Sequence, residues 1–189
     1  MTSLPGNIDL QNPKVLQKIE ARDLQIAAVH EVGHAMVSSL YGYTAKPYIY
    51  RNPYYYYSGR FENPDPAPIA VREFGLAEKL WCGACEAPWP SMPKNVLRLA
   101  SLGGWVAEQI EIHGEEWATI WIDNPWPLAT HLRAHIRDGV ISVSDLSGID
   151  RVTERDLVRV VRILLPVWDS VLSWADDVME HPRRSRLCD

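Results

Sequence analysis

The residues of this 189-residue chain that are best suited to chemistry are His30, Glu31 and His34, within the stretch His30-Glu31-Val32-Gly33-His34. On an α-helix, residues four apart lie on one face, so both imidazoles can bind one zinc ion through nitrogens about 2.0–2.1 Å from it. Glu31 directly follows the first histidine, which places its carboxylate beside the ion and not on it. From there it can take a proton from the water that zinc activates. The stretch therefore predicts a metal-assisted hydrolase with one zinc ion.

A catalytic zinc site of this kind needs a third protein ligand and keeps one position open. The candidates are the acids and histidines farther along the chain: Glu108, Glu111, His113, Glu115, Glu116, Asp123, His131 and His135. A simpler interpretation is that the histidine pair is the plain surface of an amphipathic helix. We favour the metal site because the apolar residues 26–29 predict a buried helix. Two histidines and a glutamate facing a core without partners would carry a large desolvation cost.

The first elements that must position these residues are two helices. Residues 13–41 have helical spacing and form either one helix or two that meet near Asp23, a good cap residue. Residues 95–113 form a clear amphipathic helix. The pair Gly103-Gly104 inside it costs helix stability, which close approach by another backbone would offset.

The remaining pattern adds helices and one short sheet. Residues 125–136 predict a helix, and another starts at Thr153 with a reciprocal cap and is kinked at Pro166. Residues 48–50 and 54–57 have high strand propensity and flank a turn signal. The expected fold is therefore mainly α, a helical array with one small β hairpin or sheet beside the active-site cleft.

Length and composition narrow the class of protein. We expect a single domain over residues 1–189, with a core of about 14–180 and flexible termini. The net charge is −5, from 19 basic and 24 acidic residues, which argues against nucleic-acid binding. No apolar run reaches the roughly 18 residues of a membrane span, and no secretory signal or complete disulfide framework is evident, so we expect a cytoplasmic protein. No lysine follows a glycine, so the phosphate loop of an ATPase is missing.

Two stretches resemble FtsH-type ATP-dependent zinc proteases. Residues 28–35, Ala-Val-His-Glu-Val-Gly-His-Ala, are similar to that family's zinc helix A-x-H-E-A-G-H-A, and residues 102–108, Leu-Gly-Gly-Trp-Val-Ala-Glu, resemble its L-G-G-R-x-A-E helix. In the family an aspartate after the second helix completes the zinc site, and an Ala-Thr pair follows it. Asp123 and Ala129-Thr130 stand in corresponding places here. The likeness covers most of residues 20–140 and departs from the family at Trp105, where the family has arginine.

The resemblance implies a zinc metallopeptidase with His30, His34 and Asp123 as ligands, Glu31 as general base and Glu108 as an alternative ligand. The family's peptidase unit is joined to a membrane anchor and an ATPase, and this sequence predicts neither. The expected partner is therefore a peptide or an already unfolded protein, with a separate unfoldase as a further option. The tyrosine-rich residues 48–57 could accept a peptide as an added strand, although ordinary sheet packing accounts for them equally well. The sequence leaves the oligomeric state open.

Two other functions compete with the peptidase. The first is a non-catalytic metal-binding regulatory or interaction protein on the same scaffold, which Trp105 favours and the intact Glu31 disfavours. The second is a zinc amidohydrolase acting on a small molecule, which a narrow, closed pocket would favour.

Two weaker signals have simpler interpretations. Cys82-Gly83-Ala84-Cys85 is a lone C-x-x-C, which we expect to be two reduced thiols in a loop or short helix. His131 and His135 have ligand spacing, but no glutamate follows the first of them, which favours a solvated or partly packed helix face.

Overall fold

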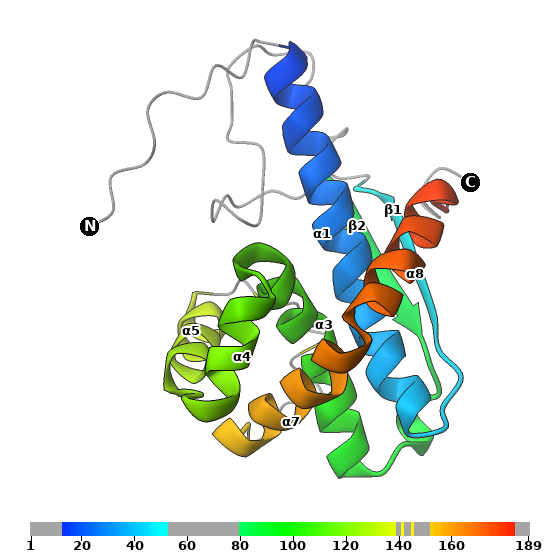
Figure 1. The fold of residues 1–189 in the computed structure, drawn as a ribbon. Helices are drawn as coiled ribbons and strands as arrows, with labels where there is room; N and C mark the ends of the chain where they lie inside the picture. Colours follow the sequence, from blue (N-terminus) through cyan, green and yellow to red (C-terminus); the bar gives the residue numbers. More distant parts are fainter. Residues whose placement is uncertain (1–12, 53–79, 139–140, 142–144, 146–151, 184–189) are drawn as a thin grey trace.

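A computed structural model describes residues 13–52, 80–138, 141, 145 and 152–183 of the chain (Figure 1). The fold is mainly helical with a small two-stranded antiparallel sheet, which confirms the predicted fold class. The helices are α1 (Pro13–Leu40), α3 (Lys94–His113), α4 (Glu115–Asp123), α5 (Trp126–Arg137), α7 (Glu154–Leu164) and α8 (Trp168–Glu180), and the strands are β1 (Lys46–Arg51) and β2 (Trp81–Glu86). Within the described ranges, no helix combines the length and apolar character that crossing a membrane requires.

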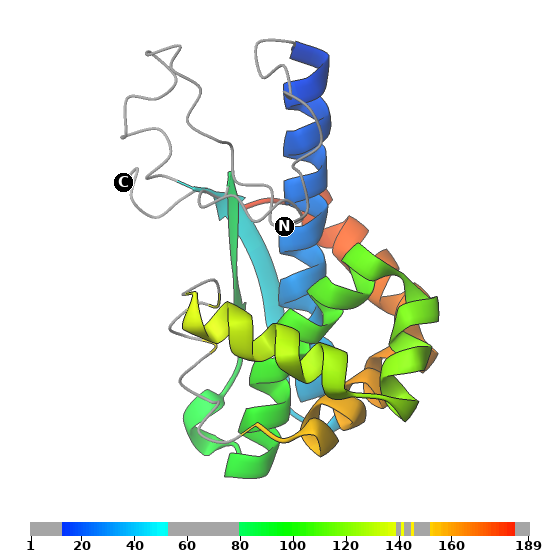
Figure 2. The same cartoon turned by 90° about the vertical axis from the view of Figure 1, so that its left-hand side faces the viewer.

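Helix α1 is the central element, and it is one continuous helix (Figure 1). The alternative of two helices meeting near Asp23 is wrong, because Asp23 lies inside α1 and is fully buried. Its Oδ2 accepts a hydrogen bond from the backbone N–H of Trp81 at 2.8 Å. Asp23 therefore ties the first residue of β2 to α1 instead of capping a helix. In Figure 2 the sheet and the helices α7 and α8 lie on different sides of α1.

Helices α1 and α3 touch through glycines. A Cβ atom built on Gly33 would collide with the carbonyl oxygen of Gly103 and lie 2.6 Å from Cβ of Ala107. A Cβ on Gly103 would in turn meet the carbonyl group of Gly33 and lie 3.0 Å from Cγ2 of Val37. The close backbone approach expected from the glycine pair is thus confirmed at Gly103, and it brings α1 and α3 side by side.

We expect Gly103→Ala to lower the free energy of unfolding by about 2 kcal/mol, because overpacking at the helix crossing outweighs the roughly 1 kcal/mol that alanine gains in helix propensity. Urea denaturation followed by circular dichroism measures the change. Ser170→Ala, at an exposed position of α8, is the control and should shift stability by less than about 0.5 kcal/mol. Unchanged stability in Gly103→Ala would contradict the close contact.

The sheet pairs β1 with β2, with Tyr48 opposite Ala84 and Ile49 opposite Gly83. The predicted strand at residues 48–50 is confirmed, whereas residues 54–57, its expected partner, lie outside the described residues. The expectation that the C-x-x-C stretch forms a loop or short helix is wrong, because it lies in β2. Strand alternation turns Cys85 inward, where it packs with Ala35, while both cysteines are free thiols.

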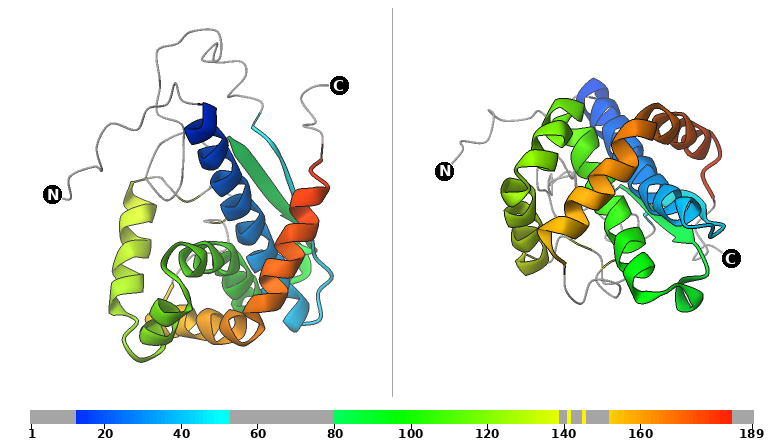
Figure 3. Two further views of the ribbon diagram at one scale, coloured as in Figure 1. Left: turned by 45° about the horizontal axis from the view of Figure 1, so that its top comes forward. Right: turned by 60° about the horizontal axis from the view of Figure 1, so that its bottom comes forward.

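The C-terminal helices follow their sequence signals closely. Thr153 caps α7: its Oγ1 accepts from the backbone N–H of Asp156, and its own N–H donates to the Asp156 carboxylate at 2.9 Å. The expected break at Pro166 is confirmed as a 3-10 turn over Leu165–Val167, after which α8 begins. Figure 3 shows α7 and α8 as consecutive helices along the outside of the molecule.

Candidate metal centre

The centre of the candidate site lies on the buried middle of α1. His30 and His34 are 8% and 4% exposed, so they are not a solvated histidine pair. One helical turn separates them, and Gly104 of α3 faces both rings. A Cβ on Gly104 would lie 2.7 Å from Nε2 of His30 and would collide with Nε2 of His34. The second glycine of the pair therefore leaves the space in which the two rings meet.

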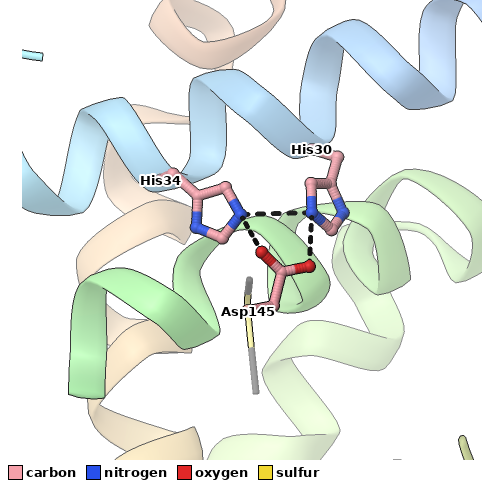
Figure 4. A group of neighbouring side chains, drawn as sticks. All are labelled: His30, His34 and Asp145. Carbon is pink, nitrogen blue, oxygen red and sulfur yellow. Dashed lines mark hydrogen bonds and ion pairs between the residues drawn. The ribbon is translucent and has the colours of Figure 1, made fainter. Parts of the chain in front are cut away.

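A carboxylate completes this group, and it belongs to Asp145. Nε2 of His30 lies 3.1 Å from Nε2 of His34 and 3.4 Å from Oδ2 of Asp145, and Nε2 of His34 lies 3.2 Å from Oδ1 of Asp145. Figure 4 shows the three side chains pointing toward one another, the histidines from α1 and the aspartate from a chain segment beyond α5. Among the described residues, this is the group of three or more potential metal ligands that the fold brings together.

The outer nitrogens of both rings are held by acceptors. Nδ1 of His30 lies 2.9 Å from Oε2 of Glu108, and Nδ1 of His34 lies 2.7 Å from the backbone oxygen of Ala100. The backbone N–H of Gly104 also approaches Nδ1 of His34, but at the longer distance of 3.3 Å. Each Nδ1 therefore carries a hydrogen and donates it, which leaves both Nε2 atoms as the ligand atoms.

The spacing of these ligand atoms suits a tetrahedral cation. Ligands about 2.0–2.1 Å from a tetrahedral zinc ion lie roughly 3.3–3.4 Å from one another. The two Nε2 atoms are 3.1 Å apart, and each lies 3.2–3.4 Å from one oxygen of Asp145, with Oδ2 nearest to His30 and Oδ1 nearest to His34. Two imidazole lone pairs so close repel each other unless a positive charge lies between them. Two imidazoles and a carboxylate are also a donor set that zinc accepts, so the residues present fit one zinc ion.

Glu31 lies beside this group and is 7% exposed. Its side chain fills the space above Gly83 of β2, where a Cβ atom would lie 2.7 Å from Oε1 and would collide with Cγ. The carboxylate is close enough to His30 to raise the pKa of that imidazole. Because Gly83 has no side chain, β2 leaves room for Glu31 and fixes its position. The glycine of the C-x-x-C stretch, and not its cysteines, therefore contributes to the site.

The electrostatics of the group match a site built for a positive charge. Burial on its own lowers the pKa of His30, but hydrogen bonds with Asp145 and Glu108 outweigh it and raise the pKa to about 9. Burial raises the pKa of Asp145, yet hydrogen bonds from both histidines hold it well below its usual range. Without a cation, His30 therefore holds a proton near neutral pH at the place where the three ligand atoms converge.

The structure brings a different carboxylate to the two histidines from the one expected as third ligand. Asp123 is the exposed last residue of α4 and does not join the two histidines. Asp145 is the carboxylate beside them. Glu108 contacts Nδ1 of His30 and so lies on the side of that ring away from Asp145. Glu111, another sequence candidate, pairs with Arg22.

The three histidine candidates form a different cluster. His131 and His135 have ring centroids 4.0 Å apart and are half-buried, in line with the partly packed face expected from the sequence. His113 lies 6.1 Å from His131, and the indole N–H of Trp105 donates to Nδ1 of His135 at 3.0 Å. Burial, followed by the nearby imidazoles, lowers the pKa of His131 to about 4. The residue that departs from the FtsH-type pattern thus packs against histidines instead of entering the metal group.

No protein-family model matches this chain, and comparison with curated proteins finds no match either. The resemblance to FtsH-type proteases therefore stays a prediction from the two motifs.

We expect Glu108→Gln to weaken zinc binding by about 10–100-fold, because an amide supports the Nδ1–H of His30 less strongly than a carboxylate does. Competition with a chromogenic chelator measures the dissociation constant. Glu111→Gln removes a carboxylate one turn along the same helix and is the matched control, with an expected change below about twofold. Equal effects of both substitutions would contradict the supporting role of Glu108.

The metal-free protein should lose stability as pH rises. The pKa of His30 is about 9 in the folded protein against 6.5 for the ordinary group, so this stabilisation is complete below pH 6.5 and is lost as pH rises through 9. The loss should reach about 3 kcal/mol. Urea denaturation with excess chelator between pH 6 and 9.5 measures it. In His30→Gln the slope over this range should disappear, and an unchanged slope would assign the effect to another group.

Proposed function

We propose that this chain is a cytoplasmic zinc-dependent peptidase with His30, His34 and Asp145 as zinc ligands and Glu31 as general base. The observation that carries the proposal is the convergence of two imidazole nitrogens and a carboxylate next to a buried Glu31. Zinc bound by these residues would act as a Lewis acid that polarises a carbonyl group and makes water a better nucleophile.

The part of the reaction that the chain's own residues perform is proton transfer. Glu31 takes a proton from the attacking water, and the water oxygen forms a bond to the carbonyl carbon of the substrate. The same carboxyl group then gives the proton to the leaving amine nitrogen as the C–N bond breaks. Contact with Gly83 holds the Glu31 side chain beside His30. A carboxylate held there can take the proton from water and give it to the leaving amine without a large movement.

The substrate class follows from the resemblance and from the ligand count. The FtsH-type motifs suggest peptide bonds in a peptide or an already unfolded protein, with delivery by a separate unfoldase as an option. Among the described residues the fold brings three potential ligands together, which is the number of protein ligands that a catalytic zinc site uses, and this favours catalysis over the regulatory metal-binding alternative.

The direct test is hydrolysis of an unfolded, fluorescently quenched protein substrate by zinc-loaded protein. We expect cleavage that stops with excess chelator and returns when zinc is restored. A folded substrate of the same sequence is the control and should stay intact. Stoichiometric zinc without cleavage of any unfolded substrate would favour the regulatory alternative, and failure to bind zinc would reject the metal centre itself.

A further inference from the structure

The outer face of α7 and α8 carries four charged residues at a regular seven-residue spacing. They are Arg155, Arg162, Asp169 and Asp176, and all four are exposed. The opposite side of the same helices is buried, with Leu157 and Leu164 in α7 and Val171 and Val178 in α8. None of the four charged residues forms an ion pair within the described part of the chain. The outer face thus has a basic half on α7 and an acidic half on α8.

The charges are arranged symmetrically about the turn that joins the two helices. Arg155 and Arg162 are seven residues apart, as are Asp169 and Asp176, and seven residues rise about 10.5 Å along a helix. The midpoint of the pair Arg162 and Asp169 falls between Leu165 and Pro166. The midpoint of the pair Arg155 and Asp176 falls at the same place. A two-fold axis there would set each arginine against an aspartate of a second copy.

The basic half also borders a groove. The groove lies beside α7 and has a volume of about 510 Å³. Its walls include three apolar residues, Pro125, Val158 and Ile163, and the three arginines of α7, Arg155, Arg159 and Arg162. Arg159 lies over the ring of Tyr41, 5.7 Å from its centroid. Glu154 is the acidic residue of the lining and lies at the first turn of α7. The same two-fold axis would bring half-buried Leu172 of the second copy opposite Arg159, over the apolar floor of this groove.

We propose that the chain forms a two-fold symmetric dimer in which α7 of each copy pairs antiparallel with α8 of the other. Arg155 faces Asp176 and Arg162 faces Asp169, each pair occurring twice. A two-fold dimer uses the same surface on both copies. A surface with a basic half and an acidic half at equal distances from the axis is therefore self-complementary, because each basic half faces the acidic half of the other copy. Exposed ion pairs are individually weak, so they select the partner and its register while the groove supplies apolar contact.

Charge reversal tests the proposal without a change in the buried face. Analytical ultracentrifugation of the full chain at about 0.1 mM should show dimers at about 0.05 M salt and largely monomers at about 1 M salt. Arg155→Glu with Arg162→Glu should raise the dimer dissociation constant at least about tenfold, because acid would then face acid. Asp169→Arg with Asp176→Arg should do the same. Circular dichroism should show unchanged helix content in both variants.

Two combinations make the test specific. The first double variant has four acidic residues on this face, and the second has four basic ones. A mixture of the two should form heterodimers, and the variant with all four charges reversed should dimerise like the original chain. A chain that stays monomeric at about 0.1 mM in low salt would overturn the proposal. A dimer that survives both double reversals would also overturn it, because another surface would then hold the copies together.

Discussion

Zinc-treated Asp145→Ala protein should retain far less than one zinc ion per chain after dialysis, whereas Asp123→Ala should retain one. Asp145 lies 3.2–3.4 Å from both Nε2 atoms, while Asp123 is exposed at the end of α4. A protein zinc site gains about 10–16 kcal/mol from all its ligands together, so loss of one ligand of three should weaken binding by roughly a hundredfold or more. Elemental analysis after dialysis and chelator competition measure the stoichiometry and the dissociation constant.

The Asp123 variant is a matched control, because it removes the same side chain from the position that the sequence favours. Asp145→Glu is a second control: it keeps a carboxylate and should bind zinc more tightly than Asp145→Ala. Circular dichroism of the metal-free variants shows whether each still folds. Zinc retained in Asp145→Ala but lost in Asp123→Ala would restore the sequence-based assignment and reject the one drawn from the structure.

The difference between these two aspartates shows what a sequence can and cannot specify. His30 and His34 share one helix, so their spacing alone fixes that they face the same way. The glycines of α3 likewise indicate a close contact, because both lower helix stability: Gly103 meets the backbone of Gly33, and Gly104 leaves room for the two imidazoles. These local rules recovered the two histidines, the helix that faces them and the cap of α7.

Which carboxylate lies beside the two histidines depends on the path of the chain between distant elements. The stretch after Gly114 forms α4, a helix that the sequence interpretation did not include, and Asp123 ends it on the exposed side. Glu115 and Glu116 in its first turn and the glycine before it are start signals that could have revealed this helix. Asp145 has no comparable signal, because no periodicity links it to residues more than a hundred positions earlier.

A related gap concerns β2. The pair Cys82 and Cys85 drew attention to thiol chemistry, but the residue between them that matters for the site is Gly83. Its contact with Glu31 arises from strand pairing with β1, and neither residue type predicts that pairing. The proposed general base is therefore positioned by an element whose strand character the sequence interpretation missed.

The largest effect on hydrolysis should come from Glu31→Gln. Glutamine has almost the same shape as glutamate and fits the same space above Gly83, but its amide cannot take a proton from water. The proposed ligands His30, His34 and Asp145 are unchanged, so we expect zinc stoichiometry to stay at one. General acid–base catalysis contributes about 10²–10⁴-fold, and peptide cleavage in the assay proposed above should fall by at least that factor. Retained cleavage would reject Glu31 as the base.

The same variant separates the two functions that the site could serve. A regulatory metal site needs no proton acceptor, so Glu31→Gln should then leave partner binding and metal affinity untouched. Gly83→Ala provides an independent approach, because the added methyl group would displace the Glu31 side chain while its carboxylate stays ionisable. Under the peptidase proposal, Gly83→Ala should lower kcat with little change in zinc affinity. Glu31→Gln alters only the charge of this side chain, and Gly83→Ala alters only its position. Loss of cleavage in both variants, with zinc retained, would therefore show that catalysis needs both the charge and the position of Glu31.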